Sequence, residues 1–146
     1  MKRSTSRILT THTGSLPRPP KLQDLLRERE EQRQSDAAAL DGGAREAVVE
    51  VVAKQAEIGV DVINDGEQGK AQYATYVKQR LTGFEGEREV RTRPRLDDAD
   101  FPEFAAQQTH LSSRNMPQPA CTGPIAWKDW PAVQRDIDTL QQAAAN

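Results

Sequence analysis

The spacing of apolar side chains predicts three amphipathic helices in this chain. In the first, Leu22, Leu25 and Leu26 lie at helical spacing within a helix-favouring segment from Lys21 to about Arg33. The second helix is expected from about Asp36 to Ile58, with Ser35 and Asp36 as candidate N-cap residues and Gly59 as the C-cap residue. One face of the second helix is lined by Ala44, Val48, Val51, Val52 and Gln55. This face suggests that the helix packs against a sheet.

The third helix is expected from Trp130 to Ala145. Its apolar positions predict one buried face: Val133, Ile137, Leu140 and Ala144. Within the second helix, the pair Gly42 and Gly43 could loosen the backbone, because glycine disfavours helix interiors.

Short β-prone runs lie between these helices. Ile8–Thr11, Val60–Asn64 and Gln118–Thr122 are predicted strands, and each is followed by a loop of polar and turn-forming residues. The order helix, Gly59, strand is typical of a parallel α/β fold. We therefore predict one α/β domain over residues 1–146, made of three βα units with parallel strands.

A charged excursion interrupts this pattern at residues 82–114. A short helix should precede it, ending near Leu81. Alternating Glu and Arg with two glycines suggest an exposed hairpin over 82–95, and residues 101–108 favour a helical turn or two. Ligands of parallel α/β folds bind where the strands end, so attention falls on the three loops after the strands.

Composition narrows the function classes. The chain is 36% hydrophobic and 29% charged, with a formal net charge of -2, which gives no field to recruit nucleic acid or an anionic membrane. The arginines of residues 88–95 are diluted by acidic neighbours. No apolar run approaches the length of a membrane span, and the basic start lacks the apolar core of a secretory signal. The single Cys121 excludes an internal disulfide, so we expect a cytoplasmic protein.

The loop after the first predicted strand has residues suited to binding a carboxylate. Gly14 allows close backbone approach to a ligand, Ser15 offers a hydroxyl and an amide, and Arg18 could pair with a carboxylate. An ordinary turn is the alternative, since Gly-Ser-x-Pro also describes many turns.

The loop after the second predicted strand contains two carboxylates. Asp65 and Glu67, separated by Gly66, suit an ammonium group or general acid–base chemistry. Alternatively, this is a capped loop in which Asp65 satisfies backbone amides and Glu67 begins the next helix.

The third loop, Cys121–Pro124, is less informative. A buried structural cysteine is the commoner interpretation of Cys121. His12, Glu67 and Cys121 could in principle converge on a zinc ion, because all three lie near strand ends. No local zinc motif supports this, and His110 is the one other imidazole in the chain.

The three strand-end motifs together resemble a known family. Ile8–Pro19, Gly59–Gln68 and Thr122–Ile125 are similar, in order and spacing, to motifs of the catalytic barrel of cobalamin-independent methionine synthases and their single-barrel relatives. The resemblance implies the first three or so βα units of a TIM (β/α)8 barrel. It also implies a 5-methyltetrahydropteroyltriglutamate–homocysteine S-methyltransferase-like function.

In that family, a barrel binds homocysteine and zinc, and methyl passes from methyltetrahydrofolate to the thiol. The resemblance implies that Ser15 and Glu67 contact the amino acid, with Thr13 and Gly14 beside them in the first loop. No role is implied for the neighbouring candidates, which remain possible site residues: His12, Arg18, Asp65 and Cys121.

The chain departs from the family in its metal ligands. The family's zinc is held by a histidine, two cysteines and a glutamate from later strands, and Cys121 alone cannot supply that set. We therefore expect no metal ligands here, no activity alone, and a second chain or homo-oligomer that completes the barrel, because an open sheet edge invites association. The alternatives are a non-catalytic remnant or binding module, and a relative acting on another thiol or methyl donor.

Overall fold

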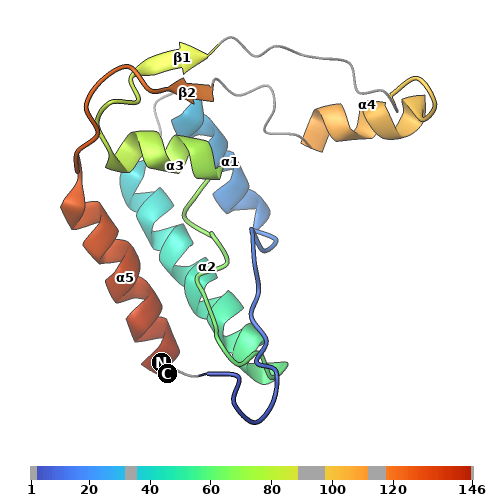
Figure 1. Ribbon diagram of the computed structural model, residues 1–146, viewed down its shortest axis with the longest axis vertical. Coiled ribbons are helices and arrows are strands. Elements are labelled where there is room, and N and C mark those ends of the chain that lie inside the picture. Colours follow the sequence, from blue (N-terminus) through green and yellow to red (C-terminus); the bar gives the residue numbers. More distant parts are fainter. Residues whose placement is uncertain (1–2, 32–35, 89–97, 112–117, 146) are drawn as a thin grey trace. The chain divides into compact units, whose positions relative to one another are not determined.

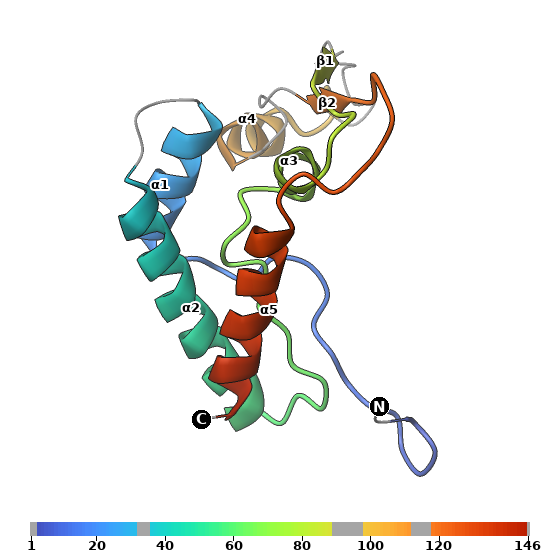
Figure 2. The same ribbon diagram turned by 90° about the vertical axis from the view of Figure 1, so that its left-hand side faces the viewer.

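Helices make up most of the regular structure (Figures 1 and 2). The structure, a computed structural model, describes residues 3–31, 36–88, 98–111 and 118–145. The chain divides into two compact units, one made of Met1–Ala71 with Asp129–Asn146 and the other of Gln72–Lys128. The helices and strands are α1 (Pro20–Glu30), α2 (Ala37–Glu57), α3 (Tyr73–Arg80), β1 (Gly86–Arg88), α4 (Pro102–Leu111), β2 (Gln118–Ala120) and α5 (Trp130–Ala145).

Helix α1 confirms the first predicted helix and ends slightly earlier than expected. Pro20 occupies its first position, where the missing amide hydrogen and fixed φ of proline are tolerated. Leu22 and Leu26 are buried against α2, in a cluster with Leu40 and Ala47. Residues 32–35, including the N-cap candidate Ser35, lie outside the described residues.

Helix α2 has the predicted ends. The Asp36 carboxylate accepts a hydrogen bond from the Ala39 amide at 3.0 Å, and Gly59 follows the helix with a φ of 82°. The two consecutive glycines do not interrupt it. The expected sheet against its apolar face is wrong, since Val48 and Val52 pack with Ala143 of α5, and Figures 1 and 2 show α5 alongside α2.

Helix α5 has the predicted bounds, and its predicted buried face is confirmed in part. Leu140 packs against the cluster of Val48, Val52 and Ala143, as expected. Ala132 and Ala143 are the fully buried residues, whereas the predicted Ile137 is 40% exposed and Ala144 is exposed.

The second unit corrects the third predicted strand. β2 pairs antiparallel with β1, in the register Gly86 to Ala120 and Arg88 to Gln118. Of the hairpin expected over residues 82–95, residues 86–88 form β1 and pair with β2, and residues 89–95 lie outside the described residues. Helices α3 and α4 confirm the helices predicted near residues 70–81 and 101–108.

The first two predicted strands shorten to one parallel bridge between Thr11 and Val62. The two segments do run in the same direction side by side, as expected, but without a full ladder. The fold is therefore mixed helix and strand with little sheet in the described residues. None of the described helices combines the length and the apolar character that crossing a membrane requires.

Candidate functional site

Two loops of the first unit form the candidate site. We call residues 12–18 the first loop and residues 64–70 the second loop; each follows one of the two parallel segments. The Val62 amide donates to Thr10 O at 3.1 Å, and the Thr11 hydroxyl donates to Val62 O at 2.7 Å. Because the segments are parallel, both loops leave from the same end of the pair.

An ion pair ties the two segments together before the loops begin. The Asp61 carboxylate accepts hydrogen bonds from Arg7 Nη1 at 2.8 Å and from the Thr10 amide at 2.9 Å. These donors favour the ionised carboxylate and hold the pKa of Asp61 well below its usual range, with Arg7 as the largest cause.

The second loop contains a tight turn with an unusual backbone. Gly66 and Glu67 have φ values of 58° and 56°, and the Gln68 amide donates to Asp65 O at 3.2 Å, as in a type I′ turn. Glycine is favoured at the first central position, because a side chain there would be strained at this φ and its Cβ would lie 3.1 Å from Leu16 Cβ. Glu67 is not a glycine, and this backbone costs such a residue roughly 1–2 kcal/mol.

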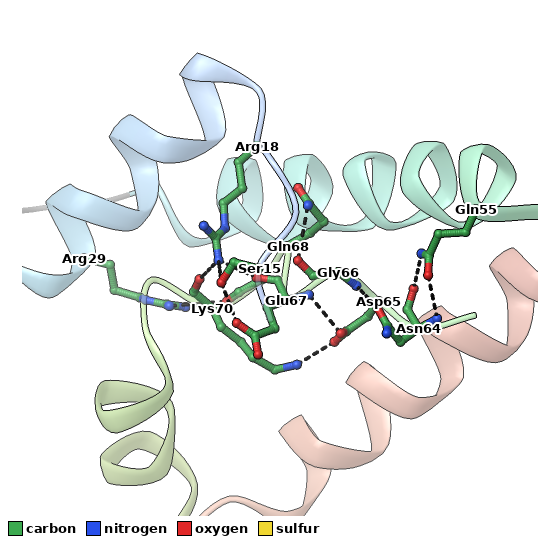
Figure 3. Close-up of polar contacts among 11 residues, drawn as sticks. Ser15, Arg18, Arg29, Gln55, Asn64, Asp65, Gly66, Glu67, Gln68 and Lys70 are labelled. Carbon is green, nitrogen blue, oxygen red and sulfur yellow. Dashed lines mark hydrogen bonds and ion pairs between the residues drawn. The ribbon is translucent and has the colours of Figure 1, made fainter. Parts of the chain in front are cut away.

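Side chains hold the amide, the carbonyl and one carboxylate oxygen of Glu67 (Figure 3). Its amide donates to Asp65 Oδ1 at 3.0 Å, its carbonyl accepts from Arg18 Nη2 at 2.8 Å, and its Oε2 accepts from Ser15 Oγ at 2.5 Å. A strained residue persists where its surroundings fix it in several ways, and such residues concentrate at binding and catalytic sites. The conformation of Glu67 therefore marks it as the centre of the site.

Ser15 and Glu67 are 52 positions apart in the sequence and are in direct contact in the structure. Ser15 is exposed and Glu67 is half-buried, so the pair is accessible to a small molecule. Glu67 did not begin a helix, as one interpretation of the sequence had it, since α3 starts at Tyr73. Asp65 does satisfy backbone amides, as the capped-loop interpretation expected.

Arg18 joins the two loops from the first-loop side. Besides Glu67 O, its Nη2 donates to Lys70 O at 2.6 Å and lies 3.3 Å from Ser15 Oγ. Burial lowers the pKa of Arg18, against the opposing effect of the nearby Glu67 and Asp65 carboxylates. In the structure Arg18 thus binds protein carbonyls, and its expected pairing with a ligand carboxylate stays a prediction.

Asp65 supports the turn with its second oxygen as well. Its Oδ2 forms an ion pair with Lys70 Nζ at 2.6 Å, and both side chains are largely shielded from water. The Asp65 carboxylate therefore supports the turn with both oxygens, one bound to the Glu67 amide and the other to the Lys70 ammonium group. Lys70 was not a sequence-based candidate; its position five residues after Asp65 gave no local signal.

A second polar network holds the second loop to α2. Gln55 donates to Asn64 O at 2.8 Å and accepts from the Asn64 amide at 3.2 Å. The Asn64 side chain in turn donates to His12 O at 2.7 Å and accepts from the Gly66 amide at 2.9 Å. Gln55 did carry a signal, because a glutamine on the apolar face of a helix is unusual and needs partners.

The remaining candidate residues make fewer contacts with the rest of the site. Thr13 and Gly14 are exposed in the first loop, and Gly14 has a φ of 93° with no atom within 4 Å of where a Cβ would stand. His12 is half-buried, with no hydrogen-bond partner for its Nε2. Cys121 is exposed in the second unit, so the expectation of a buried structural cysteine is wrong.

Comparison with known families identifies the chain. The family model for the catalytic domain of cobalamin-independent synthases matches residues 8–94, which include both loops of the site. This chain belongs to that family. No curated protein and no solved structure matched the chain in the corresponding searches.

The residues described do not fit the zinc ion that the family implies. No three His, Cys, Asp or Glu side chains in the described part of the chain are grouped so that they could hold a metal. His12 Nε2 is a buried nitrogen without a partner, but one imidazole does not make a site. The chemistry considered below therefore uses only the side chains of the two loops.

Proposed function

We propose that this chain supplies the amino-acid-binding loops of a methyltransferase of the family, on part of a β/α barrel. The substrate class is a homocysteine-like amino-acid thiol, and the methyl donor is methyltetrahydrofolate. The observation that carries the proposal is the contact between Ser15 Oγ and Glu67 Oε2 at 2.5 Å. It unites two family motifs, both within the matched residues 8–94.

Under this proposal, the Glu67 carboxylate binds the ammonium group of the amino acid. Its Oε1 accepts no hydrogen bond from the described residues, so a carboxylate oxygen is available to an ammonium group next to the exposed Ser15. The turn fixes Glu67 before the ligand arrives, which limits the ordering cost of binding.

Under this proposal, the Ser15 hydroxyl and backbone amides of the first loop bind the carboxylate of the amino acid. In the structure the Ser15 hydroxyl donates to Glu67. When a ligand ammonium binds Glu67, that hydroxyl can turn to the ligand carboxylate, together with amides near Thr13 and Gly14. The open space around Gly14 allows such an approach.

The thiol-activating zinc ligands come from a partner under this proposal, either a second chain or a second copy. Large apolar side chains on the two parallel segments support association, since Ile8 is 85% exposed and Val62 is 46% exposed. The part of this chain in the reaction is to hold and orient the amino acid.

Isothermal titration of the full chain with L-homocysteine tests the proposal. We expect a dissociation constant of about 1 mM or tighter. Removing a charged or hydroxyl partner in Glu67→Gln or Ser15→Ala should weaken binding by about tenfold or more. Gln134→Ala, an exposed α5 position bonded to Asp138, is the matched control and should bind like the wild type. Equal affinity of all four proteins would refute the proposal.

A further inference from the structure

Gln68 is the most deeply buried polar side chain of the site. It is 0% exposed, although it lies in a polar loop next to the accessible Glu67. Removing an amide from water is unfavourable unless hydrogen bonds replace those it made to water. The partners of Gln68 therefore indicate why a glutamine occupies this position.

Those partners lie on both loops. Gln68 Nε2 donates to Leu16 O at 3.2 Å, to Pro17 O at 3.3 Å and to Gly66 O at 3.4 Å. Two of these carbonyls directly follow Ser15, and the third directly precedes Glu67. The Gln68 side chain thus binds backbone carbonyls next to both Ser15 and Glu67.

A backbone hydrogen bond completes this contact. The Leu16 amide donates to Gly66 O at 2.9 Å, and the Leu16 side chain covers the face of Gly66 where a Cβ would stand. Gln68 and Leu16 together therefore set which residue of the first loop lies opposite which residue of the second. A shift by one residue would move Ser15 away from Glu67, because successive side chains of extended backbone point in opposite directions.

The carboxamide oxygen of Gln68 distinguishes the alignment of the two loops from a contribution to stability alone. Gln68 Oε1 is buried and has no hydrogen-bond partner. A buried acceptor left unsatisfied destabilises a fold, so an apolar side chain of equal length would be nearly as good for stability. What such a side chain lacks is the donor that holds the Leu16 and Pro17 carbonyls.

We infer that Gln68 is a positioning residue of the amino-acid site. Its buried carboxamide holds the first loop against the turn, and so keeps Ser15 within hydrogen-bond distance of Glu67. Gln68 acts through this pair and does not touch the ligand. The inference rests on the proposed function for the ligand, but the contact between the loops can be measured without one.

The test compares Gln68→Met with a destabilised control. Methionine keeps the length of the side chain and removes the donor, and Gln68→Glu at neutral pH removes the donor while keeping the shape. Val48→Ala, in the α2–α5 cluster, removes apolar contacts and keeps every hydrogen-bonding group of the two loops. Each protein is titrated with L-homocysteine at a temperature well below its Tm, and exchange of the Leu16 amide hydrogen is followed by NMR.

We expect Gln68→Met to bind L-homocysteine about tenfold more weakly than the wild type and to lower Tm no more than Val48→Ala does. Leu16 amide exchange should be faster in Gln68→Met than in Val48→Ala. Affinity in Gln68→Met equal to that of Val48→Ala would overturn the inference. If the wild type does not bind L-homocysteine, the proposed function fails, and the Leu16 exchange rates alone then decide whether Gln68 fixes the loops.

Discussion

Each unit contains a junction between segments far apart in the sequence, and the two junctions are built differently. In the first unit, Arg18, Gln68 and Ser15 cross between the loops with side-chain hydrogen bonds. In the second unit, the crossing is made mainly by the backbone: the Thr122 amide donates to Gly83 O at 2.8 Å, and the Thr82 amide to Ala126 O at 2.9 Å.

The difference agrees with the roles proposed for the two junctions, amino-acid binding for the first and structural support for the second. Backbone hydrogen bonds fix the path of the chain whatever the side chains are, whereas the loops around Glu67 depend on particular charged and amide groups. The first junction fixes one carboxylate in a strained conformation. The second leaves its cysteine, Cys121, exposed. Substitutions at the two junctions should therefore have different consequences.

The largest effect is expected at Gly83, in the backbone junction. Its φ is 82°, and a Cβ would lie 2.6 Å from Gly123 O. Gly83→Ala should lower the free energy of unfolding by about 3 kcal/mol or more, from the left-handed backbone and the clash together. Urea unfolding measures this.

Gly14→Ala is the control for Gly83, because Gly14 has a φ of 93° but no atom near the Cβ position. Gly14→Ala should lower the free energy of unfolding by about 1–2 kcal/mol, from the left-handed backbone alone. Equal losses for the two variants would mean that the Gly83 junction is not tightly packed.

Arg18→Met should give the next largest effect, through the side-chain junction. It leaves the carbonyls of Glu67 and Lys70 without their charged donor, which should reduce the free energy of unfolding by about 2–3 kcal/mol. It should also weaken L-homocysteine binding. Arg27→Met is the matched control, since Arg27 is exposed and pairs with Asp24 at 3.2 Å. A loss no greater than that of Arg27→Met would contradict the bridging role of Arg18.

Acid should weaken the first unit through Asp61. Because the folded-state pKa of Asp61 lies below the ordinary value of 3.8, its stabilising contribution is complete above that pH and is lost as pH falls through the folded-state pKa. The Tm of the wild type should therefore fall below about pH 4. The fall should be shallower in Asp61→Asn, followed by circular dichroism from pH 7 to pH 2. Identical pH profiles would show that the Arg7–Asp61 ion pair contributes nothing.

The sequence predicted local structure better than long-range partners. The ends of α2 followed from Asp36 and Gly59, because capping depends on residues a few positions apart. The buried face of α5 was predicted in part, with Leu140 correct and Ala144 one residue away from the buried Ala143, since helical periodicity alone does not say which neighbour a helix meets. The pairing of β2 with β1 was also missed, because a three-residue strand carries no mark of its partner's direction.

The sequence predicted that the loops of Ser15 and Glu67 lie together, as their hydrogen bond shows, but it did not predict the residues that support them. Ser15 and Glu67 stood out because loops after parallel strands gather polar groups. Gln68 and Lys70 did not, because their value comes from carbonyls and a carboxylate that only folding brings near them. The left-handed φ of Glu67 was likewise invisible, since a glutamate gives no sequence signal for that conformation.

The central claim is that Glu67 binds the ammonium group of an amino-acid thiol, and paired titrations test it most directly. L-homocysteine and 4-mercaptobutyrate, which lacks only the ammonium, are each titrated into the wild type and into Glu67→Gln. The wild type should prefer L-homocysteine by about tenfold or more, and Glu67→Gln should bind the two thiols about equally. An undiminished preference in Glu67→Gln, or none in the wild type, would contradict the assignment.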